Sequence, residues 1–98
     1  MKLLKFEKEN CPACQMVDKF LQANNIEAVK VINPEVNPLD EPNLAVKVNP
    51  FDFPNLAAQF GIASVPVTIL LDDEGNEIQR VIGFKLDELI NLIEEFKK

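Results

Sequence analysis

Histidine, tryptophan and tyrosine are absent from this sequence, and its 98 residues include only two cysteines. Without histidine the chain has no Cys-His or Ser-His pair of the kind that hydrolases use to activate a nucleophile. A structural zinc site needs about four Cys or His ligands, so no metal site is expected within one chain. A metal ion or iron–sulfur cluster shared between two chains stays open as an alternative.

Long apolar runs and clusters of basic residues are also missing. Sixteen acidic residues against ten basic ones give a net charge of −6, which argues against a nucleic-acid partner because phosphate binding needs clustered Lys and Arg. No apolar run approaches the roughly 20 residues that span a bilayer, and residues 1–6 are too few and too charged for a secretory signal. We therefore expect a cytoplasmic protein with no membrane partner, folded as one domain over residues 1–98.

The two cysteines lie three positions apart in the run Cys11-Pro12-Ala13-Cys14. This run falls where a predicted strand, 3–6, gives way to a predicted helix, 12–24, and Pro12 suits the first turn of that helix. Thiols are kept reduced in the cytoplasm, so a pair this close is expected to react rather than to brace the fold. The helix N-terminus favours a thiolate at Cys11 and is expected to present its sulfur to solvent.

The remaining pattern predicts an alternation of strands and helices. Val-rich alternation predicts a strand over 27–32, and a short helix over 54–60 is expected to end at Gly61. An almost wholly apolar strand, 67–71, is followed by turn residues and an antiparallel partner over 77–82. Apolar residues at a helical period predict a last helix over 86–96, with acids in its first turn and lysines after its end.

An internal repeat occupies residues 28–56. Ala-Val-Lys-Val occurs at 28–31 and again at 45–48, and each copy leads through Asn-Pro to an Asp-x-Pro-Asn-Leu run. We interpret this as a local duplication, which is either a neutral insertion or a loop that contacts a partner. The first copy, 28–32, is favoured as the sheet strand because a short connection joins it to the first helix. That choice leaves 44–48 as an extra edge strand or an ordered loop.

The order of elements, the cysteine motif and two later landmarks together resemble the thioredoxin/glutaredoxin superfamily. The landmarks are Ser64-Val65-Pro66 before the apolar strand and Gly83 after the hairpin. The resemblance implies an α/β fold with a mixed four-stranded central sheet in the order β-α-β-α-β-β-α, flanked by helices. The 33–54 insert would then supply any additional edge strand.

The same resemblance implies the roles of the site residues. The Val65–Pro66 peptide bond is expected to be cis, and the backbone of Val65 is expected to pair with an extended substrate segment. Cys11 is the expected attacking thiolate and Cys14 the resolving thiol, with Pro12 and Ala13 between them supporting the pair. Gly83 marks the third side of the site, and the redox-active disulfide takes the place of a cofactor.

Several residues depart from the family pattern. Lys5 stands where thioredoxins bury an acid, and Asn10 replaces the tryptophan before the first cysteine. Our hypothesis is that the charge of Lys5 or Lys8 lowers a thiol pKa. Lys8 and Pro12 also resemble glutaredoxin positions that hold glutathione, but Phe84 replaces the second glycine that would let the tripeptide approach.

These features predict a thiol–disulfide oxidoreductase that reduces protein disulfides as a monomer. The run from Gly83 to Asp87 resembles small redoxins that serve ribonucleotide reductase, so that enzyme is one expected partner. Thioredoxin reductase or glutathione is the expected electron donor. The alternatives are a glutathione-dependent glutaredoxin, a dimeric metal or iron–sulfur carrier, and an interaction domain whose dithiol is incidental.

Overall fold

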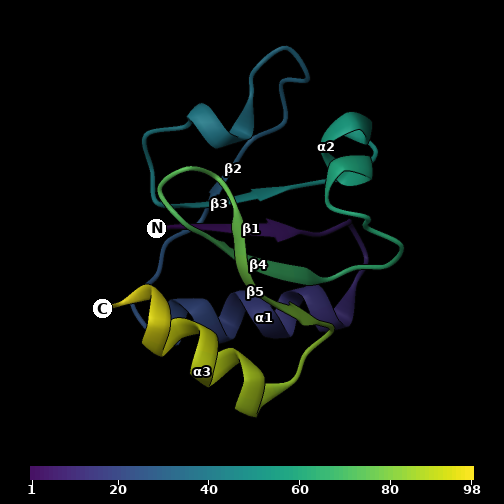
Figure 1. The fold of residues 1–98 in the computed structure, drawn as a ribbon. Coiled ribbons are helices and arrows are strands. Elements are labelled where there is room, and N and C mark those ends of the chain that lie inside the picture. Colours follow the sequence, from purple (N-terminus) through teal and green to yellow (C-terminus); the bar gives the residue numbers. More distant parts are fainter.

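The protein, described over residues 1–98 by a computed structural model, places a five-stranded sheet between two layers of helices. In Figure 1, α1 and α3 cover one face of the sheet, and α2 and a short 3-10 turn, η1, lie on the other. The elements in chain order are β1 (Lys2–Phe6), α1 (Pro12–Ala23), β2 (Val29–Lys30), η1 (Pro38–Asp40), β3 (Ala45–Val48), α2 (Pro54–Gln59), β4 (Val67–Leu71), β5 (Glu77–Ile82) and α3 (Leu86–Phe96).

The strand β1 is the centre of the sheet, whose order is β2-β3-β1-β4-β5. It pairs parallel with β3 and antiparallel with β4. Successive side chains of a strand point to opposite faces, so Leu4 and Phe6 join the hydrophobic core under α2 while Leu3 joins the core under α1 and α3. The residues after Phe6 therefore leave the sheet at its centre and lead directly to the cysteines.

The prediction of which repeat copy enters the sheet centre was wrong. The strand beside β1 is β3, from the second copy, whereas the first copy contributes only the two-residue edge strand β2. The second copy runs straight into α2, which covers one face of β3, and a strand beside β1 must be covered on both faces. The first copy instead leads into a long loop. The extra edge strand thus comes from Val29–Lys30 and not from the 33–54 insert, and the sheet has five strands rather than four.

The other predicted elements are confirmed within one or two residues. Both long helices, the short helix before Gly61 and the β4–β5 hairpin occupy the predicted ranges. In α3 the buried residues are Leu89, Leu92 and Ile93, while Leu86 and Ile90 are exposed. The face of α3 that packs on the sheet therefore includes Leu92 and leaves out Leu86 and Ile90. None of the helices has the length and apolarity needed to cross a membrane.

Truncation of the sheet centre tests this arrangement. Leu4 is fully buried between β3 and β4, so Leu4→Ala is expected to lower the free energy of unfolding by about 2–5 kcal/mol in urea titrations. The matched control is Leu44→Ala, whose side chain is 62% exposed and whose loss is expected to change stability by less than about 0.5 kcal/mol. Equal losses in the two variants would contradict the described core.

Candidate active site

The two cysteines form a disulfide at the first turn of α1, with their Cα atoms 5.2 Å apart. Cys11 is the N-cap of the helix, and its Sγ accepts a hydrogen bond from the backbone N–H of Cys14 at 3.1 Å. Pro12 occupies the first helical position, where its missing N–H costs nothing. The first sulfur therefore lies at the positive end of the helix dipole, which favours a thiolate once the disulfide is reduced.

Cys11 is the more solvent-accessible of the two cysteines, although it is less exposed than the sequence predicted. Cys11 is 6% exposed and Cys14 is 2% exposed. Pro12 is exposed and Ala13 is partly exposed, so the motif reaches solvent chiefly through the residues between the cysteines. Asn10 turns the chain into the helix with a left-handed φ of 54°, a conformation that asparagine adopts more readily than most residues.

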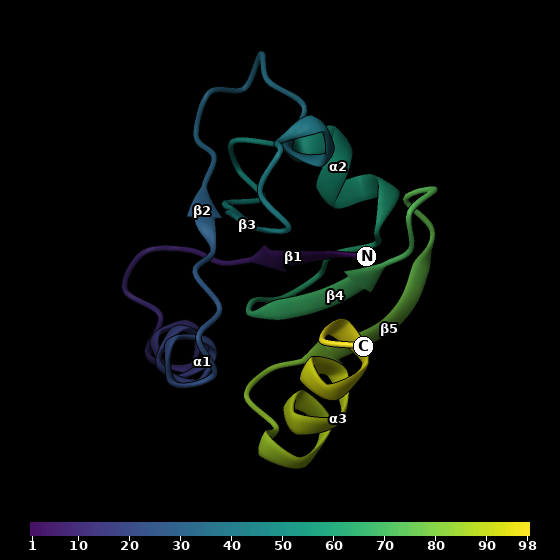
Figure 2. The ribbon, with the colours of Figure 1, turned by 90° about the vertical axis from the view of Figure 1, so that its left-hand side faces the viewer.

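Sheet pairing brings Pro66 and Gly83 to the same end of the sheet as the disulfide. Phe6 pairs with Val67, and Val67 pairs with Ile82. The loop after β1, the start of β4 and the end of β5 consequently lie side by side, as Figures 1 and 2 show. The Val65–Pro66 peptide bond is cis, which is the geometry that the resemblance implies.

Gly83 is joined directly to this proline turn. Its backbone N–H donates a hydrogen bond to the carbonyl oxygen of Pro66 at 2.8 Å. Gly83 has a φ of +81°, in the left-handed region that favours glycine. Glycine therefore allows the left-handed backbone conformation that the chain adopts where β5 meets the proline turn.

Arg80 fixes the other end of the loop that leads to Pro66. Its Nη2 donates to the carbonyl oxygen of Phe60 at 2.7 Å, and the same nitrogen donates to Glu77 at 2.6 Å. The hydrogen bond from Arg80 holds the pKa of the Glu77 carboxyl below its ordinary value. The loop over 61–66 is therefore held to β5 at its start by Arg80 and at its end by Gly83.

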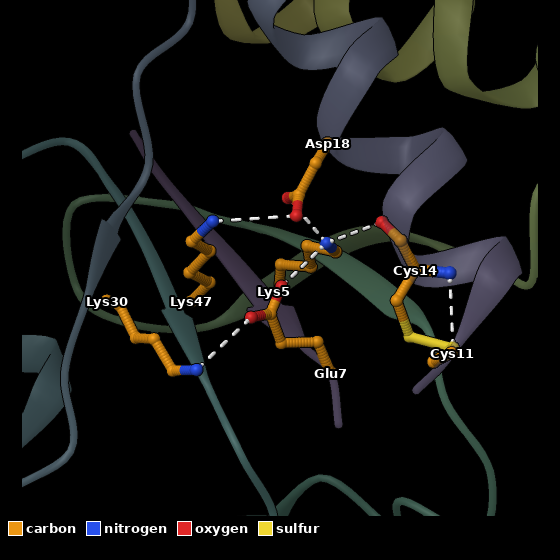
Figure 3. Close-up of a disulfide and its surroundings, with 7 residues drawn as sticks. All are labelled: Lys5, Glu7, Cys11, Cys14, Asp18, Lys30 and Lys47. Atoms are coloured by element: carbon orange, nitrogen blue, oxygen red, sulfur yellow. Dashed lines mark hydrogen bonds and ion pairs between the residues drawn. A yellow bond between two sulfur atoms is a disulfide. The ribbon is translucent and has the colours of Figure 1, made fainter. Parts of the chain in front are cut away.

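Behind the disulfide, three lysines stand side by side across the sheet. Lys30 of β2 pairs with Lys47 of β3, and Lys47 pairs with Lys5 of β1. We call these three residues the lysine row, shown in Figure 3. Aligned like charges repel, so the row requires compensating carboxylates from outside the three strands.

Lys5 is fully buried, and all three protons of its ammonium have acceptors. Its Nζ lies 2.8 Å from Oε1 of Glu7, 2.6 Å from Oδ1 of Asp18 and 2.9 Å from the backbone carbonyl oxygen of Cys14. An ammonium has three donors and no acceptor, so this geometry satisfies it completely. One hydrogen bond connects the central strand to the backbone of the second cysteine.

The two carboxylates also serve the outer members of the lysine row. Asp18 of α1 lies 3.5 Å from Nζ of Lys47, and Glu7 lies 4.0 Å from Nζ of Lys30. On the other side of Lys5, its sheet neighbour Thr68 is fully buried, and its hydroxyl has no hydrogen-bond partner. The charge compensation is thus concentrated on the side of Lys5 that faces β3 and α1.

Sequence reasoning identified Lys5 as unusual but missed Glu7, Asp18 and Lys47. Glu7 follows β1 directly, and the alternation of Leu3, Lys5 and Glu7 is a signal that places Glu7 on the same face as Lys5. Asp18 could not be found in this way because its position depends on the rotation of α1.

Lys8 lies apart from this cluster: it is exposed and lines a groove with Ser64 and Val65. No group of three or more His, Cys, Asp or Glu side chains is placed to hold a metal ion.

Comparison with known proteins identifies the fold and the family. Residues 2–97 match the thioredoxin-like domain family. The chain belongs to this family. It is 38% identical over 97 residues to the SPbeta prophage-derived thioredoxin-like protein YosR of Bacillus subtilis strain 168, covering 99% of this chain and 100% of the relative.

Two further relatives are thioredoxins by name. The thioredoxin of Chlamydia caviae is 36% identical over 94 residues, covering 95% of this chain and 79% of its own length. The crystal structure of thioredoxin NaTrxh from Nicotiana alata is 25% identical and superimposes with a TM-score of 0.68, covering 95% of this chain and 70% of the other. Family membership and the spacing of the cysteines support a thiol–disulfide oxidoreductase in general. The roles of individual site residues stay predictions.

Removal of the Lys5 charge tests the buried cluster. Lys5→Met leaves the carboxylates of Glu7 and Asp18 without their central cation, so the free energy of unfolding of the oxidised protein is expected to fall by about 3 kcal/mol. The control is Lys85→Met, which removes an exposed ion pair with Glu88 at 3.7 Å and is expected to cost less than about 0.5 kcal/mol. Similar urea midpoints for Lys5→Met and the unaltered protein would show that Lys5 does not hold the cluster together.

Proposed function

We propose that this protein reduces disulfides in other proteins by dithiol exchange through Cys11 and Cys14. The observation that carries the proposal is the disulfide at the N-terminus of α1, where Cys11 accepts the N–H of Cys14. The Val65–Pro66 turn supports it, because sheet pairing brings this turn to the same end of the sheet as the disulfide, where the backbone of Val65 would align an extended substrate segment. A reducing compartment such as the cytoplasm is the setting that fits this chemistry.

The proposed reaction begins with the reduced protein. The Cys11 thiolate attacks one sulfur of the substrate disulfide, forming a mixed disulfide and releasing the other substrate sulfur as a thiolate that takes up a proton. Cys14 then loses its proton and attacks Cys11, which releases the second substrate sulfur as a thiolate that takes up a proton in turn. The products are a substrate dithiol and the Cys11–Cys14 disulfide, so two electrons have passed to the substrate.

The hydrogen bond from Lys5 to the carbonyl oxygen of Cys14 gives that cysteine a fixed backbone position for the second step. The donor Nζ is 2.9 Å from this oxygen and is itself held by two carboxylates. We therefore assign Lys5 as a positioning residue that acts through Cys14. Pro12, Ala13 and Gly83 complete the site by shaping the helix start and the proline turn.

Thioredoxin reductase is the proposed electron donor, and ribonucleotide reductase is one proposed substrate. Phe84 follows Gly83 where a second glycine would let glutathione approach closely, which favours the protein donor over glutathione. The side chain of Phe84 also packs against the core under α1 and α3. The chain is proposed to act as a monomer.

An insulin-reduction assay distinguishes the electron donors. Turnover is expected with thioredoxin reductase and NADPH, and little turnover with glutathione, glutathione reductase and NADPH. The control is dithiothreitol, which tests the dithiol chemistry without either donor. Turnover with the glutathione system but not with thioredoxin reductase would assign the protein to the glutaredoxin side of the superfamily. No turnover with either donor or with dithiothreitol would overturn the proposed function.

Single cysteine variants test the order of the two steps. Cys14→Ser is expected to accumulate a mixed disulfide between Cys11 and the substrate, because the resolving thiol is missing. Alkylation of the remaining free thiols preserves this adduct for measurement. Cys11→Ser is expected to form no such adduct and to lose nearly all turnover, since no other thiolate lies at the helix end. Intact mass spectrometry measures the adducts, and an adduct formed preferentially by Cys11→Ser would reverse the assigned roles.

The reduction potential tests the direction of electron flow. No histidine or other cation lies between the two cysteines, so the thiolate lacks one source of strong stabilisation. The midpoint against a glutathione buffer is expected at roughly −200 to −270 mV, as for reducing members of the family. A midpoint of about −120 mV would instead make the protein an oxidant.

A further inference from the structure

A groove of about 470 Å³ begins at Val65, next to the proposed substrate-aligning turn. Its walls also include Lys8, from the loop between β1 and Cys11, and Phe51, from the turn between β3 and α2. The groove is therefore lined by the loop that leads to Cys11 and by the residues just before Pro66, and it extends toward the segments on either side of α2. None of the proposed exchange steps uses Phe51.

Phe51 is the most exposed of the large hydrophobic side chains, with 85% of its surface open to solvent. A lone exposed apolar residue needs no explanation by itself. An aromatic ring that lines a cavity beside a reactive site is different, because such rings are frequent anchors of protein recognition. The contribution that the ring can make to binding therefore depends on how rigidly the backbone holds Phe51.

The turn that carries Phe51 is held on both sides. The side-chain oxygen of Asn49 accepts the N–H of Phe51 at 2.9 Å, and the backbone oxygen of Asn49 accepts the N–H groups of Asp52 and Phe53 at 3.0 and 3.3 Å. Phe53 is buried in the core, and Pro54 begins α2. A ring presented on a fixed turn loses less conformational entropy when it binds a partner.

The first copy of the repeat provides an internal comparison. Pro38-Leu39-Asp40 corresponds to Pro50-Phe51-Asp52, and Asn37 accepts the N–H of Leu39 at 3.0 Å as Asn49 does for Phe51. Leu39 packs against the hydrophobic core, whereas Phe51 faces solvent and the groove. The same turn thus partly buries its apolar residue in one copy and exposes a larger one in the copy that lines the groove.

Lys8 gives the groove its charge. It is the only charged residue that lines the groove, and it forms no ion pair, although Lys5, Lys30 and Lys47 are all paired. In a chain of net charge −6, an unpaired cation at this place favours a carboxylate on an approaching partner over a second basic group.

We propose that this groove binds the substrate segment that flanks the target disulfide, with a large apolar side chain against Phe51 and a carboxylate near Lys8. This inference rests on the proposed disulfide-reductase function and names the class of segment that the site prefers. The two contacts serve different ends. Apolar contact with Phe51 sets the preference among substrates, and the charge of Lys8 increases the rate of encounter in a salt-dependent manner.

The test uses cyclic disulfide peptides with an otherwise alanine-rich sequence. Each peptide carries one leucine at one of the three positions on either side of a cysteine, and peptide reduction by the reduced protein is followed by chromatography. One leucine position is expected to raise kcat/KM about tenfold over the all-alanine peptide. Phe51→Ala is expected to remove that preference, and Leu44→Ala, which alters an exposed leucine away from the groove, is expected to keep it.

The charge contact is tested in the preferred peptide by exchanging one glutamine for glutamate. The glutamate peptide is expected to react about threefold faster at low salt, and this gain is expected to disappear at high ionic strength or in Lys8→Gln. The control is Lys19→Gln, which removes an exposed charge from α1. A gain that persists in Lys8→Gln would overturn the role of Lys8.

The outcomes separate this inference from the proposed function. If the unaltered protein reduces every peptide equally, or if Phe51→Ala keeps the leucine preference, the groove assignment fails while the reductase function stands. If it reduces none of the peptides, the proposed function itself fails. Self-association measured by sedimentation that Phe51→Ala abolishes would assign the groove to a second copy of this chain and overturn the substrate assignment.

Discussion

A buried ammonium group at the centre of the sheet is the constraint on which the rest of the site depends. Lys5 lies on the central strand, and its three acceptors come from the strand end, from α1 and from the backbone of Cys14. A charge removed from water in this way is tolerated only when every donor is satisfied. The strand, the loop after it and the cysteine-bearing helix must therefore adopt one mutual arrangement. Lys5 thus puts a cation at the position where thioredoxins bury an acid, and the carboxylates of Glu7 and Asp18 surround it.

The lysine row connects this local requirement to the architecture of the sheet. Because β2 and β3 pair in register, the equivalent lysines of the two repeat copies, Lys30 and Lys47, are neighbours. Lys47 in turn is the neighbour of Lys5 on β1. Glu7 and Asp18 reach across this row from a strand end and from α1. The same two carboxylates thus contact the lysine that holds the Cys14 backbone and the lysines of β2 and β3. A substitution of Glu7 or Asp18 is therefore expected to affect both the disulfide site and the pairing of the strands.

The parts that sequence predicted well are those whose signals are local. The cysteine spacing, the apolar run over 67–71 and the turn residues before β5 each fix an element without reference to the rest of the chain. The partner of β1 could not be chosen in the same way, because both copies contain the same Ala-Val-Lys-Val run. The choice depends on tertiary packing: the second copy leads into an α-helix, α2, whose residues pack with β3 in one core, whereas the first copy is followed only by the short turn η1.

The site was predictable to the same extent. Cys11, Cys14, Pro66 and Gly83 were predicted as site residues from short motifs, and sheet pairing brings the segments that carry them to one end of the sheet. The burial of Lys5 depends on the register of β3 and on the rotation of α1, neither of which a single sequence shows. The contrast between exposed Phe51 and buried Phe53 likewise arises from the tertiary position of one turn.

The in-register pairing of β2 with β3 means that one edge of the sheet is made by a sequence lying against its own duplicate. Val29 faces Val46 and Lys30 faces Lys47, as in parallel assemblies built from identical segments. A tandem duplication at this place yields a strand that already matches the edge on which it docks. The protein can therefore gain sheet width by copying its own edge, two strands away from the disulfide, while the helix and the proline turn that surround the sulfurs keep their sequence.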